Sequence, residues 1–326
     1  MKRVAVIMGS WLILAVASCA PQTDLAARPV RPMQTMDGSI LSLASSSGPN
    51  AEPSRVGLPA PQAASATAGP SITEAAFDSQ TAPLALIDQL TVIKSKPWEQ
   101  LQLGYYKLVN NVWGAPNDEG LSSGVYSEPN GSFGWYWDRP RPQAKAGESI
   151  ACPIYPSVRI GGSPWEESSS RAFPVRVGDL RSLTFDVTYG YPSVPTGSDD
   201  LAYDVFFADT NQPSAKPVIK AEVMIWVRAT ATEPADRYVG DFSDGGNTYA
   251  LYSWVMASGR QYYAFVMKPK AGYEARHVVD AKRLFDGLAL QPDWWIHGIE
   301  FGSEVWQGSG KIEISQLTIT LNGSEP

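Results

Sequence analysis

The chain contains little histidine, little cysteine and no excess of positive charge. Only 2 His and 2 Cys occur among 326 residues, too few for a His-rich metal site and enough for at most one disulfide. Any Ser-His-Asp mechanism would have to use His277 or His297. With 26 basic against 33 acidic residues the formal net charge is −7, so the charge pattern of a nucleic-acid-binding protein is missing. We expect no metal, no cofactor and no nucleic-acid partner.

The amino terminus has an uncharged run that is too short for a membrane helix. Residues 4–18 follow two basic residues and number 15, whereas a membrane-spanning helix needs about 20. This arrangement is typical of an export signal. The run ends in the letters VASC, which resemble a bacterial lipobox in which Cys19 becomes lipidated. We therefore predict a lipoprotein-type signal peptide over 1–18 and placement at an outer membrane or cell surface. Cleavage after Ala17 by ordinary signal peptidase would instead give a secreted or periplasmic protein.

The segment from 19 to 84 has the composition of a flexible tether. It is rich in Ala, Ser, Pro, Gly and Thr, it lacks Trp and Tyr, and it shows no sustained helical or strand period. Such a segment cannot bury enough apolar surface to offset its ordering entropy. Of the 35 aromatic residues, 33 lie between Trp98 and Trp306. The sequence thus predicts one folded domain over 85–326.

Short alternating runs, broken by Gly, Pro, Asn and Asp, fill this domain. The clearest are Leu183–Tyr189, Leu201–Phe207, Val218–Arg228, Tyr262–Met267 and Lys311–Leu321. Period-2 alternation over many short segments indicates a sandwich of antiparallel sheets. One segment, Val278–Leu288, has apolar residues at helical spacing and is predicted to be a short helix.

Two of the predicted strands carry carboxylates beside tryptophan. In Val218–Arg228 one face is purely apolar, and the other carries Glu222, Met224 and Trp226. Glu222 taken alone would more often be a solvated residue on an exposed sheet face. The segment Trp295–Trp306, however, places Glu304 on a face with glycines, which weaken a strand unless something must approach closely. Two sheet-borne carboxylates with neighbouring indoles are what glycosidic hydrolysis needs, since indole faces stack on sugar rings.

Four motifs then carry a resemblance to glycoside hydrolase family 12. They are Glu222–Trp226, Phe301–Gly310, Tyr203–Phe206 and Asn110–Gly114, and the similarity covers about residues 100–322. The resemblance implies an all-β jelly roll of two antiparallel sheets with a concave substrate cleft. It implies Glu222 as nucleophile, Glu304 as acid/base and Asp204 as a residue that holds and tunes Glu222. It also implies substrate-binding residues, namely Asn111, Trp113, Met224, Trp226 and Trp306, to which a further similar strand adds Trp135 and Trp137.

Two positions depart from that pattern or stand outside it. Glu300 shares the predicted strand face of Glu304 and would either raise the pKa of that acid or form a peripheral salt bridge. Cys152 is expected to behave as a small buried hydrophobic residue.

The predicted function is endo-acting hydrolysis of β-1,4-glucosidic bonds in cellulose-type glucans or xyloglucan, with retention of configuration. The expected partner is a β-glucan, the expected state is a monomer, and a membrane is contacted only through the lipid anchor. Two alternatives stay open at this point: a xylanase of the sister family, and a surface glycan-binding protein without turnover.

Overall fold

The computed structural model describes residues 91–115, 118–144, 151–230 and 235–325. The predicted signal peptide, Cys19 and the tether lie outside these residues. Within them, no helix is long and apolar enough to cross a membrane.

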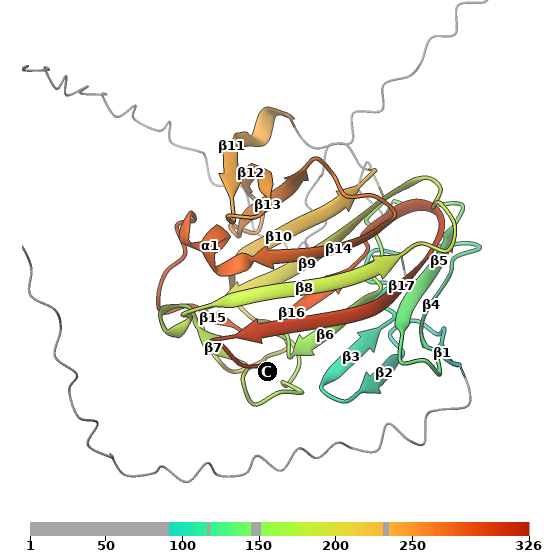
Figure 1. Ribbon diagram of the computed structural model, residues 1–326, viewed down its shortest axis with the longest axis horizontal. Helices are drawn as coiled ribbons and strands as arrows, with labels where there is room; N and C mark the ends of the chain where they lie inside the picture. Colours follow the sequence, from blue (N-terminus) through green and yellow to red (C-terminus); the bar gives the residue numbers. More distant parts are fainter. Residues whose placement is uncertain (1–90, 116–117, 145–150, 231–234, 326) are drawn as a thin grey trace, which may run out of the picture. The chain divides into compact units, whose positions relative to one another are not determined.

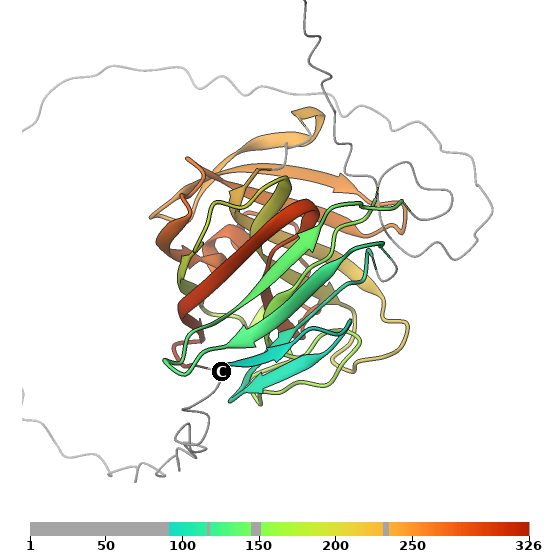
Figure 2. The same cartoon turned by 90° about the vertical axis from the view of Figure 1, so that its right-hand side faces the viewer.

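Six strands form sheet A. In spatial order they are β1 (Val92–Lys94), β4 (Ser122–Ser127), β5 (Phe133–Arg139), β17 (Val305–Leu321), β8 (Leu183–Gly190) and β14 (Glu274–Asp280), and all neighbours are antiparallel. Figure 1 shows β14, β8 and β17 side by side, and Figure 2 shows the same sheet turned by 90°.

Sheet B is larger and carries most of the predicted site residues. In spatial order its strands are β2 (Gln100–Leu103), β3 (Tyr106–Val109), β6 (Ser157–Gly161), β16 (Gly298–Gly302), β9 (Ser198–Ala208), β10 (Ile219–Ala229), β13 (Gln261–Lys268), β12 (Thr248–Val255) and β11 (Tyr238–Ser243). The short β15 (Trp295–Ile296) joins β9 to β7 (Val175–Arg176). The described residues also form two 3-10 turns, η2 (Val177–Asp179) and η3 (Ala235–Arg237), and one α-helix. One neighbour pair, β10 and β13, is parallel, so the expectation of purely antiparallel sheets holds for every other pair.

The hydrophobic core lies between the two sheets, and strand alternation places it there. In β8 the buried residues are Leu183, Phe185, Val187 and Tyr189, every second position. In β10, Val223 belongs to the same core cluster while its neighbours in sequence face the other way. Sheet B therefore has one face in the core and one face turned away from it.

The predicted helix is shorter than expected. Helix α1 spans Ala281–Asp286. Its N-cap is Asp280, whose side chain accepts a hydrogen bond from the backbone N–H of Arg283 at 3.1 Å. Val278 and Val279 belong instead to β14, where they pair with β8. Val278 is exposed and Val279 is buried, as in a strand. Over so few residues this pattern is also compatible with the apolar spacing of a helix.

Trp135 and Trp137 lie in the core, so the expectation that they line the cleft is not met. Both are buried in the core cluster from β5 of sheet A, with Trp137 only 2% exposed. Trp135 donates a hydrogen bond from Nε1 to Ser303 Oγ at 2.9 Å. Cys152 is fully buried, as predicted, but it is disulfide-bonded and so is more than a small hydrophobic residue.

Candidate active site

The face of sheet B turned away from the core carries the predicted carboxylates in register. On β10 this face holds Glu222, Met224 and Trp226, and on β9 it holds Asp204. Met224 lies opposite Asp204, and Asp204 lies opposite Glu300 of β16. Antiparallel neighbours place directly opposed side chains about 5 Å apart. Segments far apart in sequence thus meet at one row across the sheet.

The same face is sheltered. Met224 and Trp226 are 1% and 2% exposed although they do not face the core between the sheets. They form a second apolar cluster with residues of β13, including Tyr262, and Trp254 of β12 packs against it. The rings of Trp254 and Tyr262 lie 4.3 Å apart, centroid to centroid. This aromatic cluster borders the carboxylates on one side, since Tyr262 of the cluster lies opposite Glu222.

Glu222 is buried beside an arginine. Its Oε2 lies 2.7 Å from a guanidinium nitrogen of Arg260, which also contacts Met256 Sδ at 2.8 Å. The pKa of Glu222 is raised on balance, because burial and the charge of Glu300 outweigh the charge of Arg260, which lowers it. The cation therefore supports the ionised form that a nucleophile requires.

Asp204 is a buried carboxyl group whose pKa responds to the charge of Glu222. It is 7% exposed, and its Oδ1 is buried with no hydrogen-bond partner among the described residues. Burial and the charges of Glu222, Glu300 and Glu304 raise its pKa well above the usual range. Asp204 consequently gives up its proton at a higher pH than an exposed aspartate, and its titration depends on the charge of Glu222.

Glu304 follows the end of β16 and is fixed by Asp200. The backbone N–H of Glu304 donates to Asp200 Oδ1 at 3.2 Å, and the N–H of Asp200 donates to the Glu304 carbonyl at 3.0 Å. The Trp135 bond to Ser303 holds the preceding residue from the core side. Burial, the charges of Asp200 and Glu222, and a side-chain hydrogen bond with Asp200 raise the pKa of Glu304 well above its usual range. Glu304 therefore keeps its proton to a higher pH than an exposed glutamate does.

Glu300 forms a salt bridge, which is one of its two expected roles. Its charge raises the pKa of residues other than Glu304. Its Oε1 lies 2.8 Å from a guanidinium nitrogen of Arg159, and Ser157 Oγ donates to its Oε2 at 3.3 Å. Its charge raises the pKa of Asp204 and Glu222. The carboxylate that contributes most to raising the pKa of Glu304 is Asp200, which sequence analysis did not single out.

The amino-terminal motif lies at the edge of this cluster. The carbonyl of Asn111 accepts a hydrogen bond from the N–H of Tyr155 at 2.8 Å, and its Oδ1 accepts one from the N–H of Trp113 at 3.1 Å. The hydroxyl of Tyr155 donates to Ala202 O at 3.0 Å. The pKa of Tyr155 is raised by burial and by the charges of four carboxyl groups, Asp204, Glu300, Asp200 and Glu304. Asn111 is therefore linked to the carboxylate row through Tyr155, and Trp113 is linked to Asn111.

The last predicted tryptophan, Trp306, stands two residues after Glu304 at the start of β17 and is 9% exposed.

Sequence analysis missed several residues of the site because they are brought in by strand pairing. Tyr262 lies opposite Glu222 on the parallel neighbour β13, and its hydroxyl donates to Met224 Sδ at 2.7 Å. Arg260 precedes the same strand. The only sequence signal for Tyr262 was the alternation of its strand, which does not tell which strand it joins. His297, by contrast, is buried and contacts Thr210 O at 2.7 Å, a structural role.

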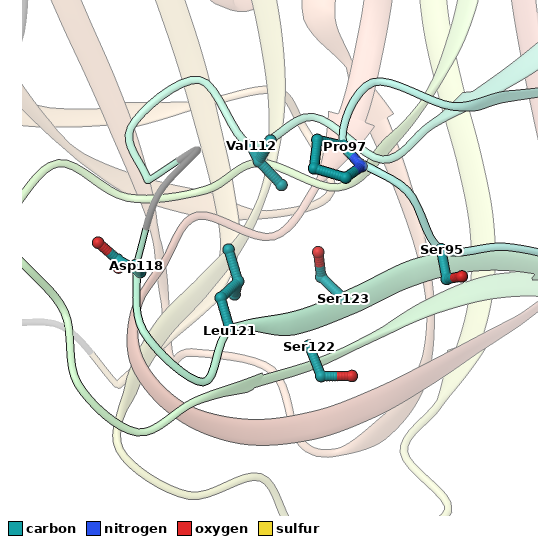
Figure 3. Close-up of a pocket in the computed structure, with 7 residues that line it drawn as sticks. All are labelled: Ser95, Pro97, Val112, Asp118, Leu121, Ser122 and Ser123. Atoms are coloured by element: carbon teal, nitrogen blue, oxygen red, sulfur yellow. The ribbon is translucent and has the colours of Figure 1, made fainter.

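A separate cavity lies near the amino-terminal strands. It has a volume of about 260 Å³ and is lined by Ser95, Pro97, Val112, Asp118, Leu121, Ser122 and Ser123 (Figure 3). The carboxylate of Asp118 is committed to Arg139, whose Nε lies 2.7 Å away. None of the carboxyl groups of the row described above lines this cavity, so it is not the site of the paired-carboxylate chemistry.

Two sheets packed face to face, with a row of buried carboxyl groups on an aromatic-bordered face, define a jelly-roll protein with a glycosidase-type site. The comparison with known families agrees: the model of Glycosyl hydrolase family 12 matches residues 104–322. The chain belongs to glycoside hydrolase family 12.

Individual relatives are distant. Endoglucanase S of Pectobacterium parmentieri is 26% identical over 225 residues, which cover 66% of this chain and 81% of that protein. Among solved structures, a family 12 xyloglucanase from Bacillus licheniformis with a bound ligand is similar with a TM-score of 0.62 and 26% identity, covering 71% of this chain and 100% of that one. Endoglucanase cel12A from Rhodothermus marinus, at 21% identity and a TM-score of 0.58 over 72% of this chain and 100% of that one, supports the fold alone.

Proposed function

We propose that this glycoside hydrolase cleaves internal β-1,4-glucosidic bonds of cellulose-type glucans or xyloglucan by double displacement. The observation that carries the proposal is the contrast between Glu222, which pairs with Arg260 at 2.7 Å, and Glu304, whose pKa is raised well above its usual range by burial and by Asp200. Two carboxyl groups whose environments separate their pKa values are what an acid and a nucleophile need.

In the first step Glu222 attacks the anomeric carbon, and Glu304 gives its proton to the departing glycosidic oxygen. The proton on Asp204 can hydrogen-bond Glu222 as its charge changes. In the second step Glu304, now ionised, takes a proton from water, which attacks the anomeric carbon and releases Glu222. The sugar keeps its configuration because two inversions occur.

The proposal is tested with Glu222→Gln and Glu304→Gln in a reducing-sugar assay on cellulose, mixed-linkage glucan, xyloglucan and xylan. Each substitution should lower turnover on the preferred glucan by at least about 100-fold, with the circular dichroism spectrum unchanged. NMR of the first product should show the β-anomer. An α-anomer would overturn double displacement, and a preference for xylan would move the enzyme to the alternative substrate class. Binding of all four polymers without turnover would favour the glycan-binding alternative.

We also propose that the enzyme is exported and anchored through a lipid on Cys19. Support comes from the VASC sequence and the tether composition alone. About 65 flexible residues reach roughly 40–50 Å on average, far enough to act on polymer near a membrane surface.

A further inference from the structure

The turn that follows β6 is held rigidly at the edge of the site. In this turn the N–H of Ser163 donates to Glu166 O at 3.0 Å, and the N–H of Glu166 donates to Ser163 O at 3.1 Å. The carbonyl of Pro164 accepts a further bond from the N–H of Ser214 at 2.9 Å. The turn therefore has little conformational freedom left to lose on binding a ligand.

At the tip of this turn Trp165 presents an indole to solvent. Its exposed fraction is 49%, although the backbone that carries it is fixed. The rings of Trp165 and Phe206 are nearly perpendicular, at 85°, with 5.3 Å between their centroids. This contact orients the indole, and the 49% exposure leaves much of its surface uncovered, which is the arrangement of a pre-organised stacking surface.

Phe206 connects this indole to the nucleophile. It shares the site face of β9 with Asp204, and it lies directly opposite Glu222. The guanidinium of Arg260, which pairs with Glu222, lies 5.8 Å from the Phe206 ring centroid. Arg260, Phe206 and Trp165 thus follow one another along the Glu222 side of the site. Asp200, whose side chain accepts a hydrogen bond from the backbone N–H of Glu304, lies toward the other end of β9 from Phe206.

An ion-pair network ties the turn to the floor of the site. The carboxylate of Glu166 lies 2.9 Å from Lys107 Nζ on β3 and 2.7 Å from a guanidinium nitrogen of Arg159 on β6. Arg159 in turn pairs with Glu300 at 2.8 Å, and Glu300 lies opposite Asp204. The residue next to Trp165 is therefore coupled to the same row of side chains that leads to the catalytic carboxylates.

We propose that Trp165 is a sugar-binding residue that stacks on a pyranose ring of the bound glucan, on the side of the cleft formed by β6 and β3. Glu166 is its positioning residue. The inference rests on the proposed function and adds a specificity-determining contact to it. The stacked pyranose ring can belong to the glucan backbone or to a sugar branched from it. Binding of unbranched and branched oligosaccharides distinguishes the two.

The test is calorimetric binding of cellohexaose and of a branched xyloglucan oligosaccharide to the full chain carrying Glu222→Gln. Adding Trp165→Ala should raise Kd roughly 2- to 12-fold, whereas Trp165→Phe should recover most of the affinity. Glu166→Gln should give a smaller change in the same direction. A rise in Kd for both ligands assigns the stacked ring to the backbone, and a rise for the branched ligand alone assigns it to a branch. Tyr136→Ala, an aromatic truncation on the outer face of sheet A, is the matched control and should leave both Kd values unchanged.

Failure of this inference and failure of the proposed function give different results. If the Glu222→Gln protein binds neither oligosaccharide, the proposed function is overturned, and Trp165 with it. If that protein binds and Trp165→Ala leaves both Kd values within twofold, Trp165 is not a sugar-binding residue. Glu166→Gln repeats the binding measurement with the indole retained. The inference can therefore still be tested if Trp165→Ala does not fold.

Discussion

Neighbouring buried aspartates on β9 should respond in opposite ways to the same substitution. Asp199 and Asp200 are both 0% exposed. Asp199 Oδ2 lies 2.6 Å from a guanidinium nitrogen of Arg228, whereas Asp200 Oδ2 is buried with no hydrogen-bond partner among the described residues. The pKa of Asp200 is raised well above 3.8, mainly by burial and also by the charge of Asp199.

The sign of the pH effect follows from proton binding. Because the folded state holds the proton of Asp200 more tightly than the unfolded state, the folded protein binds more protons above about pH 4. Its stability therefore falls as pH rises from there through the raised pKa, by up to about 1.4 kcal/mol per pH unit for one proton. Asp200→Asn keeps the acceptor for the Glu304 N–H and removes the titration. It should flatten this pH dependence and raise stability at pH 7–8.

Asp199→Asn should instead destabilise the protein by about 3–5 kcal/mol across pH 5–8, because it leaves Arg228 buried without its counterion. Arg228 is 3% exposed and lies 4.9 Å and 4.5 Å from the ring centroids of Tyr191 and Tyr273. Urea unfolding at pH 5, 6, 7 and 8 measures both effects. The reasoning is refuted if Asp200→Asn gives a free energy of unfolding that runs parallel to the wild type over this range. It is also refuted if the two variants change stability alike. A second measurement, the ¹³C titration of Glu304, should show a lower pKa in Asp200→Asn since a like charge is gone.

Three further outcomes are expected. Asp204→Asn should move the acidic limb of the kcat/KM profile and lower the rate, and an unchanged profile with full activity would remove Asp204 from the site. Arg260→Met should raise the pKa of Glu222, shifting the acidic limb to higher pH, because the group that favours the ionised carboxylate is lost; a limb that stays in place would contradict the assignment. Cys19→Ser should release the protein from the membrane fraction, and mass spectrometry of the mature amino terminus decides the point, since an unmodified terminus or a Cys19–Cys152 disulfide would exclude the lipid.

The fold class and the central carboxylates could be predicted because they depend on local periodicity and on contiguous motifs. Alternation in Val218–Arg228 separates the face of Glu222 from the apolar face, and β10 keeps this separation. The motif around Glu304 lies in a single segment, and so does that of Asp204. Such features need no knowledge of which strands are neighbours.

The rest depended on pairing and on which face meets the core. Alternation put Trp137 on one face of its strand, but only its place in sheet A showed that this face is the core. Tyr262 reaches Glu222 through a parallel pairing of β13 with β10, and Asp200 reaches Glu304 through contacts between residues 104 positions apart. Strand periodicity assigns side chains to faces and is silent on register and partner, since those are set by the packing of the whole sheet. The sequence by itself therefore determined the sandwich and its two catalytic candidates, and the tertiary structure decided which charges surround them.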